Sequence, residues 1–420
     1  MTNFLNNTYR KEIIFIFFLY LTLIISFVFG ENSTGGAIKD YANQKNVMQK
    51  FASDFLETFY QYDTFRTRHS PVLVIFLSFF EKVNLPDSLI RFIHLNLCLL
   101  LPIFFYKCLS IKFNKVDKKI LLLLVSLIFL SPTFRTLAIW PDSRLFGLIL
   151  FTLSIYFFLK FDERKNFLYA FYNVITLAIS AYVSPNFSVF SIFFMMRFIS
   201  YYGIFSKNIL FLALINLLLS LPAFYYVFII DVNFFLQSAA VGMKGDEKIY
   251  FNNIFNDILI TFSIIFFYLL PFVFFKIIKL DNIFSPKNFI ISVLVFLICL
   301  FNFDYNYSYT GGGFFFKLSN FIFSNNYLFY IISFISVLIF CCLITKNYFN
   351  ILLFLLIILN NPQYTIYHKY FDPFLIIMFL TIFSFNFDLE KINSRKNYLY
   401  IFVYFLTFLI ISNFKFILIS

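Results

Sequence analysis

The sequence predicts an all-α polytopic transmembrane protein, and three observations lead to this fold class. Of the 420 residues, 61% are hydrophobic and only 13% are charged, and the mean hydropathy is +0.84. A soluble domain usually carries about 25% charged residues, so this chain lacks the polar surface that water would require. The apolar residues also gather in runs that approach the length of a membrane-spanning helix, about 20 residues. We therefore expect a helical bundle of about 13 spans that occupies residues 1–420, without a separate soluble domain.

The predicted spans follow one another with mostly short connections. The first is too long for the apolar core of a signal peptide, and no small-residue cleavage site follows it, so we expect it to remain in the protein. Residues 71–80 are apolar but about half as long as the bilayer requires, and we interpret them as re-entrant or interfacial. The thirteen spans are expected near residues 13–29, 88–106, 120–134, 144–159, 167–183, 187–203, 208–229, 254–275, 289–303, 327–345, 348–360, 371–387 and 398–413.

The distribution of the basic residues indicates how these spans are oriented in the membrane. With the N-terminus inside, the inner segments hold 18 Lys and Arg, whereas the outer segments after the first loop hold 7. Cytoplasmic loops of membrane proteins carry such an excess. We therefore expect a multi-pass protein of the plasma (inner) membrane with a cytoplasmic N-terminus. The net charge of +12 does not indicate a nucleic-acid partner, because the basic residues are scattered among short loops and form no stripe.

The first outer loop, residues 30–70, has a pattern of its own. Apolar side chains recur in it at steps of three or four residues, with polar residues between them. This spacing predicts an amphipathic helix that lies in the membrane interface. Such a helix either covers a cavity that opens toward lipid or simply anchors the loop. The apolar positions are Met48, Phe51, Phe55, Phe59 and Tyr62.

Ionisable residues are nearly absent from the centres of the predicted spans and occur instead at their outer ends. This distribution favours chemistry or binding at the outer boundary over an ion-coupled pump, which places such groups at mid-membrane depth. Asp40, soon after the first span, could act as a general base or be a solvated loop residue. Asp142 follows Pro141 and suits either a site or the start of the next helix.

Two further groups stand at outer helix ends. His69 precedes Ser70-Pro71, where Pro suits a first helical turn and His could bind a phosphate or a sugar. His368 and Lys369 place a donor and a cation where a lipid phosphate would lie, although a Lys here could also only reach toward the interface. Gly311–Gly313 would allow either a close backbone approach or a flexible loop. The five Cys form no metal-spaced pair and indicate no disulfide framework.

Taken in order, these features resemble the GT-C superfamily of polytopic glycosyltransferases, especially the bacterial relatives of protein O-mannosyltransferases and of the lipid A aminoarabinose transferase. The shared order is one helix, a long outer loop with an Asp, a His-x-Pro helix start, an Arg…Asp loop and a late basic-Tyr motif. Asp40 matches the acid of the first loop, and His69 matches the His of the helix start. Arg135 and Asp142 match the second outer loop, and the late motif is matched by His368, Lys369 and Tyr370.

The resemblance implies a GT-C-like fold with an active site on the periplasmic or extracellular face. It implies a polyprenyl-phosphate-linked sugar as donor and a glycan, lipid or protein as acceptor, in contact with membrane lipids. Asp40 would be the base, Asp142 would shape the sugar or acceptor site, and Arg135 and Lys369 would hold phosphate with His368 as an accessory donor. Tyr370 completes the binding set. A divalent cation (Mg or Mn) is compatible with this scheme, no residue is assigned as a metal ligand, and the sequence leaves open whether such an ion is required.

Three alternative functions remain open. A flippase or other transporter of lipid-linked glycans would favour an internal repeat and polar residues at mid-depth, neither of which the sequence displays. An O-antigen-type polymerase or ligase would favour a large, late outer loop rich in Arg, whereas the longest outer loop here is the first. A non-enzymatic subunit of a membrane assembly is the third alternative.

Overall fold

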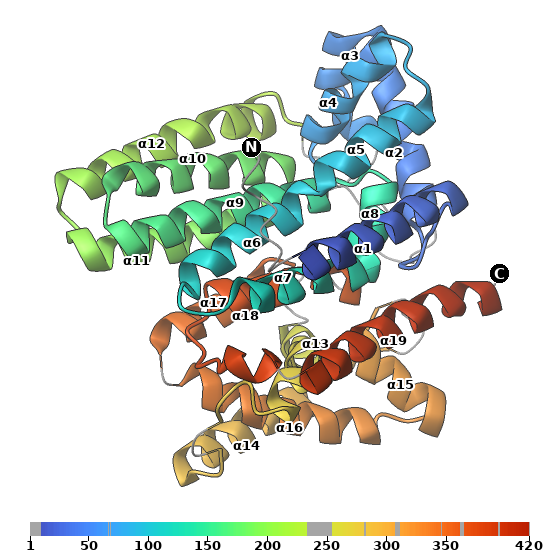
Figure 1. Ribbon diagram of the computed structural model, residues 1–420. Coiled ribbons are helices and arrows are strands. Elements are labelled where there is room, and N and C mark those ends of the chain that lie inside the picture. Colours follow the sequence, from blue (N-terminus) through green and yellow to red (C-terminus); the bar gives the residue numbers. More distant parts are fainter. Residues whose placement is uncertain are drawn as a thin grey trace. The chain divides into compact units, whose positions relative to one another are not determined.

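The computed structural model describes residues 10–419, apart from residues 66, 68, 233–253, 281–282, 307–310, 346, 362–364 and 394. The regular elements among these residues are helices, and the only strand-like pairing is an isolated bridge between Ile278 and Phe387 (Figure 1). The chain forms two compact units. Unit 1 comprises Met1–Asp246 with Phe405–Ser420, and unit 2 comprises Glu247–Tyr404.

Unit 1 is built from antiparallel helices whose longest member, α9, packs along α10 and α6 (Figure 1). Gly147 allows the close approach of α9 to the end of α10, because a Cβ atom there would lie 2.6 Å from the Cβ atom of Ser184. The helices of unit 1 are α1 (Arg10–Phe29), α2 (Ala37–Ser53), α3 (Phe55–Tyr60), η2 (Tyr62–Phe65), α4 (Pro71–Lys82), α5 (Asp87–Cys98), α6 (Leu100–Lys112), α7 (Lys118–Ser126), η3 (Leu127–Leu130), α8 (Pro132–Ile139), α9 (Ser143–Arg164), α10 (Phe167–Val183), η4 (Pro185–Phe190), α11 (Ser191–Tyr202), α12 (Lys207–Phe224) and η5 (Tyr225–Ile229).

Unit 2 is organised around α13, which packs against α14, α15 and α16. Residues on three sides of α13 are buried, which explains why this helix is apolar around its circumference. The helices of unit 2 are α13 (Ile254–Phe274), α14 (Pro286–Phe301), α15 (Gly313–Phe323), α16 (Tyr327–Ile344), α17 (Tyr348–Leu359), η7 (His368–Tyr370), α18 (Phe374–Thr381) and η8 (Leu389–Asn393), and α19 (Arg395–Ile419) begins in unit 2 and ends in unit 1.

Seven helical stretches among the described residues are long and apolar enough to cross a membrane, and an eighth results if one bent pair counts as a span. In that pair, the stretch 118–130 meets α8 at an angle of 64°, at the Ser131-Pro132 step. The polytopic all-α class is thus confirmed, whereas the number of about 13 spans remains a prediction. The seven stretches are Arg10–Phe29, Asp87–Lys112, Ser143–Arg164, Lys207–Ile229, Ile254–Phe274, Tyr327–Ile344 and Lys396–Phe414.

The apolar helices differ in what covers them. Helix α12 exposes large apolar side chains along its length, including Leu210, Leu217 and Phe224. In water such a surface would drive association, and in a bilayer the lipid tails cover it. Most of α13, by contrast, is buried within the protein. The same apolar composition therefore serves two different surroundings in this chain.

The expected span at 371–387 is not a continuous helix in the structure. Helix α18 ends at Thr381, and the chain continues in an extended form beside residues 277–279. The Lys279 amide donates to the Asn386 carbonyl at 3.2 Å, and the Asp388 amide donates to the Ile277 carbonyl at 2.7 Å. Almost every residue from Phe371 to Phe383 is buried in the protein. This run is apolar because it belongs to the core of unit 2, a cause that hydropathy does not separate from contact with lipid.

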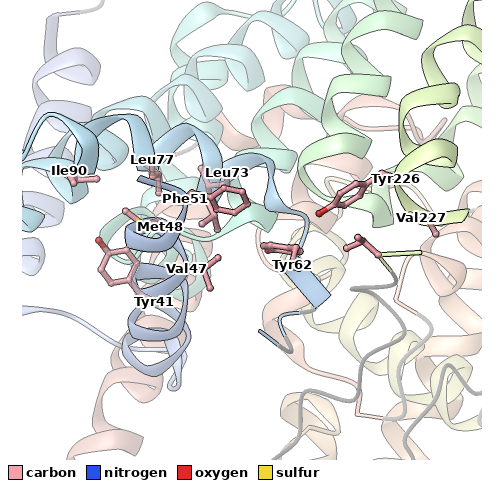
Figure 2. Close-up of a cluster of buried hydrophobic side chains, with 12 residues drawn as sticks. Tyr41, Val47, Met48, Phe51, Tyr62, Leu73, Leu77, Ile90, Tyr226 and Val227 are labelled. Carbon is pink, nitrogen blue, oxygen red and sulfur yellow. The ribbon is translucent and has the colours of Figure 1, made fainter. Parts of the chain in front are cut away.

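The loop after α1, which the sequence predicts to be the first outer loop, forms α2, α3 and η2, and the expected amphipathic pattern is real. Its apolar stripe, however, packs against α4: Met48 and Phe51 lie against Leu73 and Leu77 in a buried cluster (Figure 2). Phe55, one step further along the pattern, is 44% exposed. Helix α4 has 12 residues and is too short to cross a bilayer, as the sequence predicts for residues 71–80.

Candidate functional site

Four polar residues meet at the starts of α4 and α9, and we call them the His69–Asp142 cluster: His69, Asp142, Ser143 and Arg144. The His69 Nδ1 atom lies 2.9 Å from the Ser143 hydroxyl oxygen, although these residues are 74 positions apart in the sequence. Arg144 donates from Nε and Nη2 to the two carboxylate oxygens of Asp142, at 3.3 and 3.2 Å. Two residues predicted from separate motifs, His69 and Asp142, are therefore brought together.

The local sequence places both sides of this cluster at helix starts. Ser70 caps α4, and Pro71 occupies the first helical position, where its missing N–H costs nothing. Asp142 caps α9 by accepting the Arg144 backbone N–H at 2.7 Å. The Ser70 hydroxyl also donates to the Tyr182 carbonyl at the end of α10. Helix N-termini carry a positive partial charge, so two of them together favour an anionic group.

Asp142 is ionised although its side chain is almost completely buried. Burial raises the pKa of this carboxyl, but the charges of Arg144 and then His69 lower it more, so the pKa lies well below its usual range. A general base works best with a pKa near the working pH, and Asp142 does not meet this condition. The geometry suits a fixed carboxylate that accepts hydrogen bonds and orients a ligand.

His94 on α5 is a second histidine near Asp142, and the sequence reasoning did not select it. Its side chain is fully buried, and its Nδ1 atom lies 3.2 Å from the Ala138 carbonyl oxygen. A carbonyl only accepts, so Nδ1 carries the proton and Nε2 is the acceptor of the neutral ring. The Asp142 charge acts on His94. The sequence does contain one signal that could have identified His94, because it is an ionisable residue within an apolar run.

Arg135 is buried and is bound by its own chain. Its Nε and Nη2 atoms lie 2.9 Å from the Glu31 carboxylate, and Nη1 donates to the Thr22 hydroxyl at 3.2 Å. It also contacts the Ser26 hydroxyl and the Phe129 carbonyl. Burial raises the pKa of Glu31, but Arg135 lowers it more, so the net shift is downward. The phosphate role of Arg135 stays a prediction, and in this structure the guanidinium joins α1 to α8.

Asp40 lies half-buried in the first turn of α2. Its neighbour Tyr41 donates to the Asp87 carboxylate at 2.7 Å, and the Tyr41 ring lies 5.9 Å from the ring of Trp140. Trp140 also bears the Arg91 guanidinium at 3.5 Å from its ring centroid, a contact that sequence alone did not predict. Asp40 thus belongs to the end of unit 1 that contains the connection between α8 and α9, and its role as base stays a prediction.

The late motif lies in unit 2. His368, Lys369 and Tyr370 form the short helix η7, and the His368 Nε2 atom lies 2.9 Å from the Tyr268 hydroxyl oxygen. The segment before η7 is held by the glycines, because the Gly312 amide donates to the Ile366 carbonyl at 2.8 Å. A Cβ atom at Gly311 would lie only 2.5 Å from that carbonyl oxygen, so the close backbone approach explains this glycine.

No group of three or more His, Cys, Asp or Glu suited to a metal ion occurs among the described residues, which leaves the expectation of a divalent cation untested. Comparison of the chain with models of protein families, with curated proteins and with solved structures gives no match. The resemblance to glycosyltransferases therefore depends on the order of motifs alone.

Proposed function

We propose that the protein is an inverting membrane glycosyltransferase of GT-C-like fold, which moves a sugar from a polyprenyl-phosphate donor to an acceptor on the non-cytoplasmic face. The observation that carries the proposal is the His69–Asp142 cluster. Residues selected from two separate motifs lie together at two helix starts, where a donor phosphate and a sugar would find cations and a fixed carboxylate.

The chemistry assigns a role to each group. Asp40 takes the proton of the acceptor hydroxyl, whose oxygen then forms a bond to the anomeric carbon. The bond from that carbon to the phosphate oxygen breaks, and its electron pair leaves with the polyprenyl phosphate, so the configuration inverts. Asp142 orients the sugar. Arg144 and His69 stabilise the leaving phosphate, because the Arg135 guanidinium is already used by Glu31, Thr22 and Ser26.

The test is sugar transfer in proteoliposomes that contain the purified protein and short-chain prenyl-phosphate sugars. We expect Asp142→Asn and Arg144→Gln each to reduce transfer at least 100-fold. Asp162→Asn, at the opposite end of α9, is the matched control and should keep nearly full activity. Full transfer by both cluster variants would refute the assignment. A wild type that moves intact lipid-linked sugar across the bilayer, without transferring it, would identify the flippase alternative.

The proposed orientation can be tested separately. Helix α9 has 22 residues, about 33 Å, which is enough to separate its two ends by the thickness of a bilayer. All five native Cys are buried and should react slowly. In intact cells, a membrane-impermeant maleimide should label Lys39→Cys before α9 and should not label Lys165→Cys after it. Labelling only at position 165 would show that the orientation is the reverse of the proposed one, with the His69–Asp142 cluster on the cytoplasmic side.

A further inference from the structure

Arg91, in the second turn of α5, lies over the ring of Trp140, which directly follows α8. The guanidinium carbon is 3.5 Å from the centroid of the Trp140 ring and 5.2 Å from that of the Phe27 ring. Its Nε atom donates to the Ile139 carbonyl at 3.1 Å, and the Trp140 Nε1 atom donates to the Glu31 carbonyl at 2.9 Å. An arginine over an indole ring is a favourable cation–π contact, and the two hydrogen bonds fix both partners. The guanidinium is therefore held in one orientation.

Most of the hydrogen-bonding capacity of Arg91 is unused within the described residues. A guanidinium has five N–H groups, and only Nε–H has a partner there, so the four on the two Nη atoms remain. Neither Nη atom is fully buried. The nearest acid along α5 is engaged elsewhere, because Asp87 accepts from the Tyr41 hydroxyl at 2.7 Å and pairs with Lys45 at 3.0 Å. Asp87, Lys45 and Arg91 together therefore carry one net positive charge.

Exposed apolar side chains lie on both helices beside this guanidinium. Val28 and Phe29, at the end of α1, are 74% and 83% exposed, and Phe92, next to Arg91, is 38% exposed. The Phe27 and Phe92 rings are 5.9 Å apart, so the end of α1 lies beside the start of α5. Both helices belong to stretches that are long and apolar enough to cross a membrane, and Arg91 is near the end of one of them. In a bilayer this end lies at the boundary between hydrocarbon and head groups, where lipid phosphates are found.

We propose that Arg91 and Trp140 form a binding site for the phosphate group of an anionic membrane phospholipid. The two Nη atoms of Arg91 donate to two phosphate oxygens, and the acyl chains lie along the exposed apolar side chains of α1 and α5. The single negative charge of a phosphate diester equals the net positive charge of Asp87, Lys45 and Arg91. A free phosphate ion would use the cation but none of the apolar surface beside it. The site uses no residue of the His69–Asp142 cluster, so it is independent of sugar transfer.

Trp140 is the only Trp of the chain, so its fluorescence reports on this site directly. We would titrate the purified full-length protein, in uncharged detergent micelles, with dioleoyl phosphatidylglycerol and follow the Trp140 emission. We expect a saturable change, because the phosphate alters the charge above the indole ring. Dioleoylglycerol, which lacks the phosphate, and glycerol phosphate, which lacks the chains, should each bind about tenfold more weakly or less. An equal affinity for either compound, or no saturable change with the phospholipid, would overturn the proposal.

Three variants separate this site from general attraction between a basic protein and an anionic lipid. Arg91→Lys keeps the charge but loses the planar fork, and it should weaken phosphatidylglycerol binding about tenfold. Lys39→Gln, which removes an exposed cation of α2, is the matched control and should leave the affinity unchanged. Asp87→Asn should tighten binding severalfold, because it removes a negative charge that acts on Arg91, and it decides the matter even if the Arg91 variant does not fold. Equal losses in Arg91→Lys and Lys39→Gln, or weaker binding in Asp87→Asn, would refute the site.

Discussion

The ion pair between Glu31 and Arg135 gives the most demanding test of the fold of unit 1. The two side chains are 8% and 6% exposed and lie 2.9 Å apart. Replacing Glu31 with Gln removes the negative charge and leaves a buried guanidinium that only neutral oxygens solvate. Breaking a buried pair from one side usually costs about 3–5 kcal/mol, because the remaining charge stays desolvated. The contacts of Arg135 to Thr22 and Ser26 survive, so we expect the lower part of this range.

The assay is the equilibrium unfolding of purified protein in mixed detergent micelles, followed by circular dichroism. Glu31→Gln should lower the free energy of unfolding by about 3 kcal/mol. The matched control is Glu163→Gln, which breaks an exposed pair with Lys160 and should cost less than about 1 kcal/mol. The double variant Glu31→Gln with Arg135→Gln should be less destabilised than the sum of the single variants, since no lone charge remains. Equal costs for Glu31→Gln and Glu163→Gln would refute the reasoning.

Three further predictions concern stability in the same assay. Gly147→Ala should cost about 1–3 kcal/mol through overpacking, and Ser184→Gly in the same chain should restore most of the loss, because it removes the atom 2.6 Å from the new Cβ. Asp142 has a depressed pKa in the folded state, so its contribution is present above the unfolded pKa of about 4 and is lost as the pH falls further. Between pH 7 and 3 the free energy of unfolding should therefore change less with pH in Asp142→Asn than in the wild type. Identical pH profiles of the two proteins would contradict the lowered pKa of Asp142. Phe51→Ala should cost about 3–5 kcal/mol and exposed Phe55→Ala should cost much less, and the reverse order would mean that the stripe of α2 faces lipid.

The sequence alone predicted the helical class, the amphipathic pattern of α2 and the helix start at Pro71, and it gave a helix start as one of two roles for Asp142, because periodicity and helix-start preferences are local properties. It did not predict which surface an apolar face meets. Met48 and Phe51 are consistent with lipid contact or with packing on α4, and hydropathy is the same in both cases. The span expected at 371–387 was wrong for the same reason.

Contacts between residues that are distant in the sequence could not be predicted either. Arg135 was selected through the family resemblance, whereas its partner Glu31 was not selected at all. The meeting of His69 with Ser143 depends on how α4 packs beside α9 and α10, and no local signal records that arrangement. His94 was passed over because it lies inside an apolar run, where a single polar residue changes the mean hydropathy little.

The bend between the 118–130 stretch and α8 suggests a further role for Arg135, as a hydrogen-bond donor to the backbone at the bend. Backbone carbonyls near a broken helix need donors, and the hydrocarbon region of a bilayer supplies none. Arg135 donates to the Phe129 carbonyl just before the break, at 3.4 Å, while Glu31 neutralises the charge that this donor brings. At this 64° bend the Phe129 carbonyl therefore has a charged donor, and the charge of that donor is balanced by the Glu31 carboxylate. In a straight helix the Phe129 carbonyl would accept from the backbone N–H four residues later, so Arg135 would lose one of its acceptors.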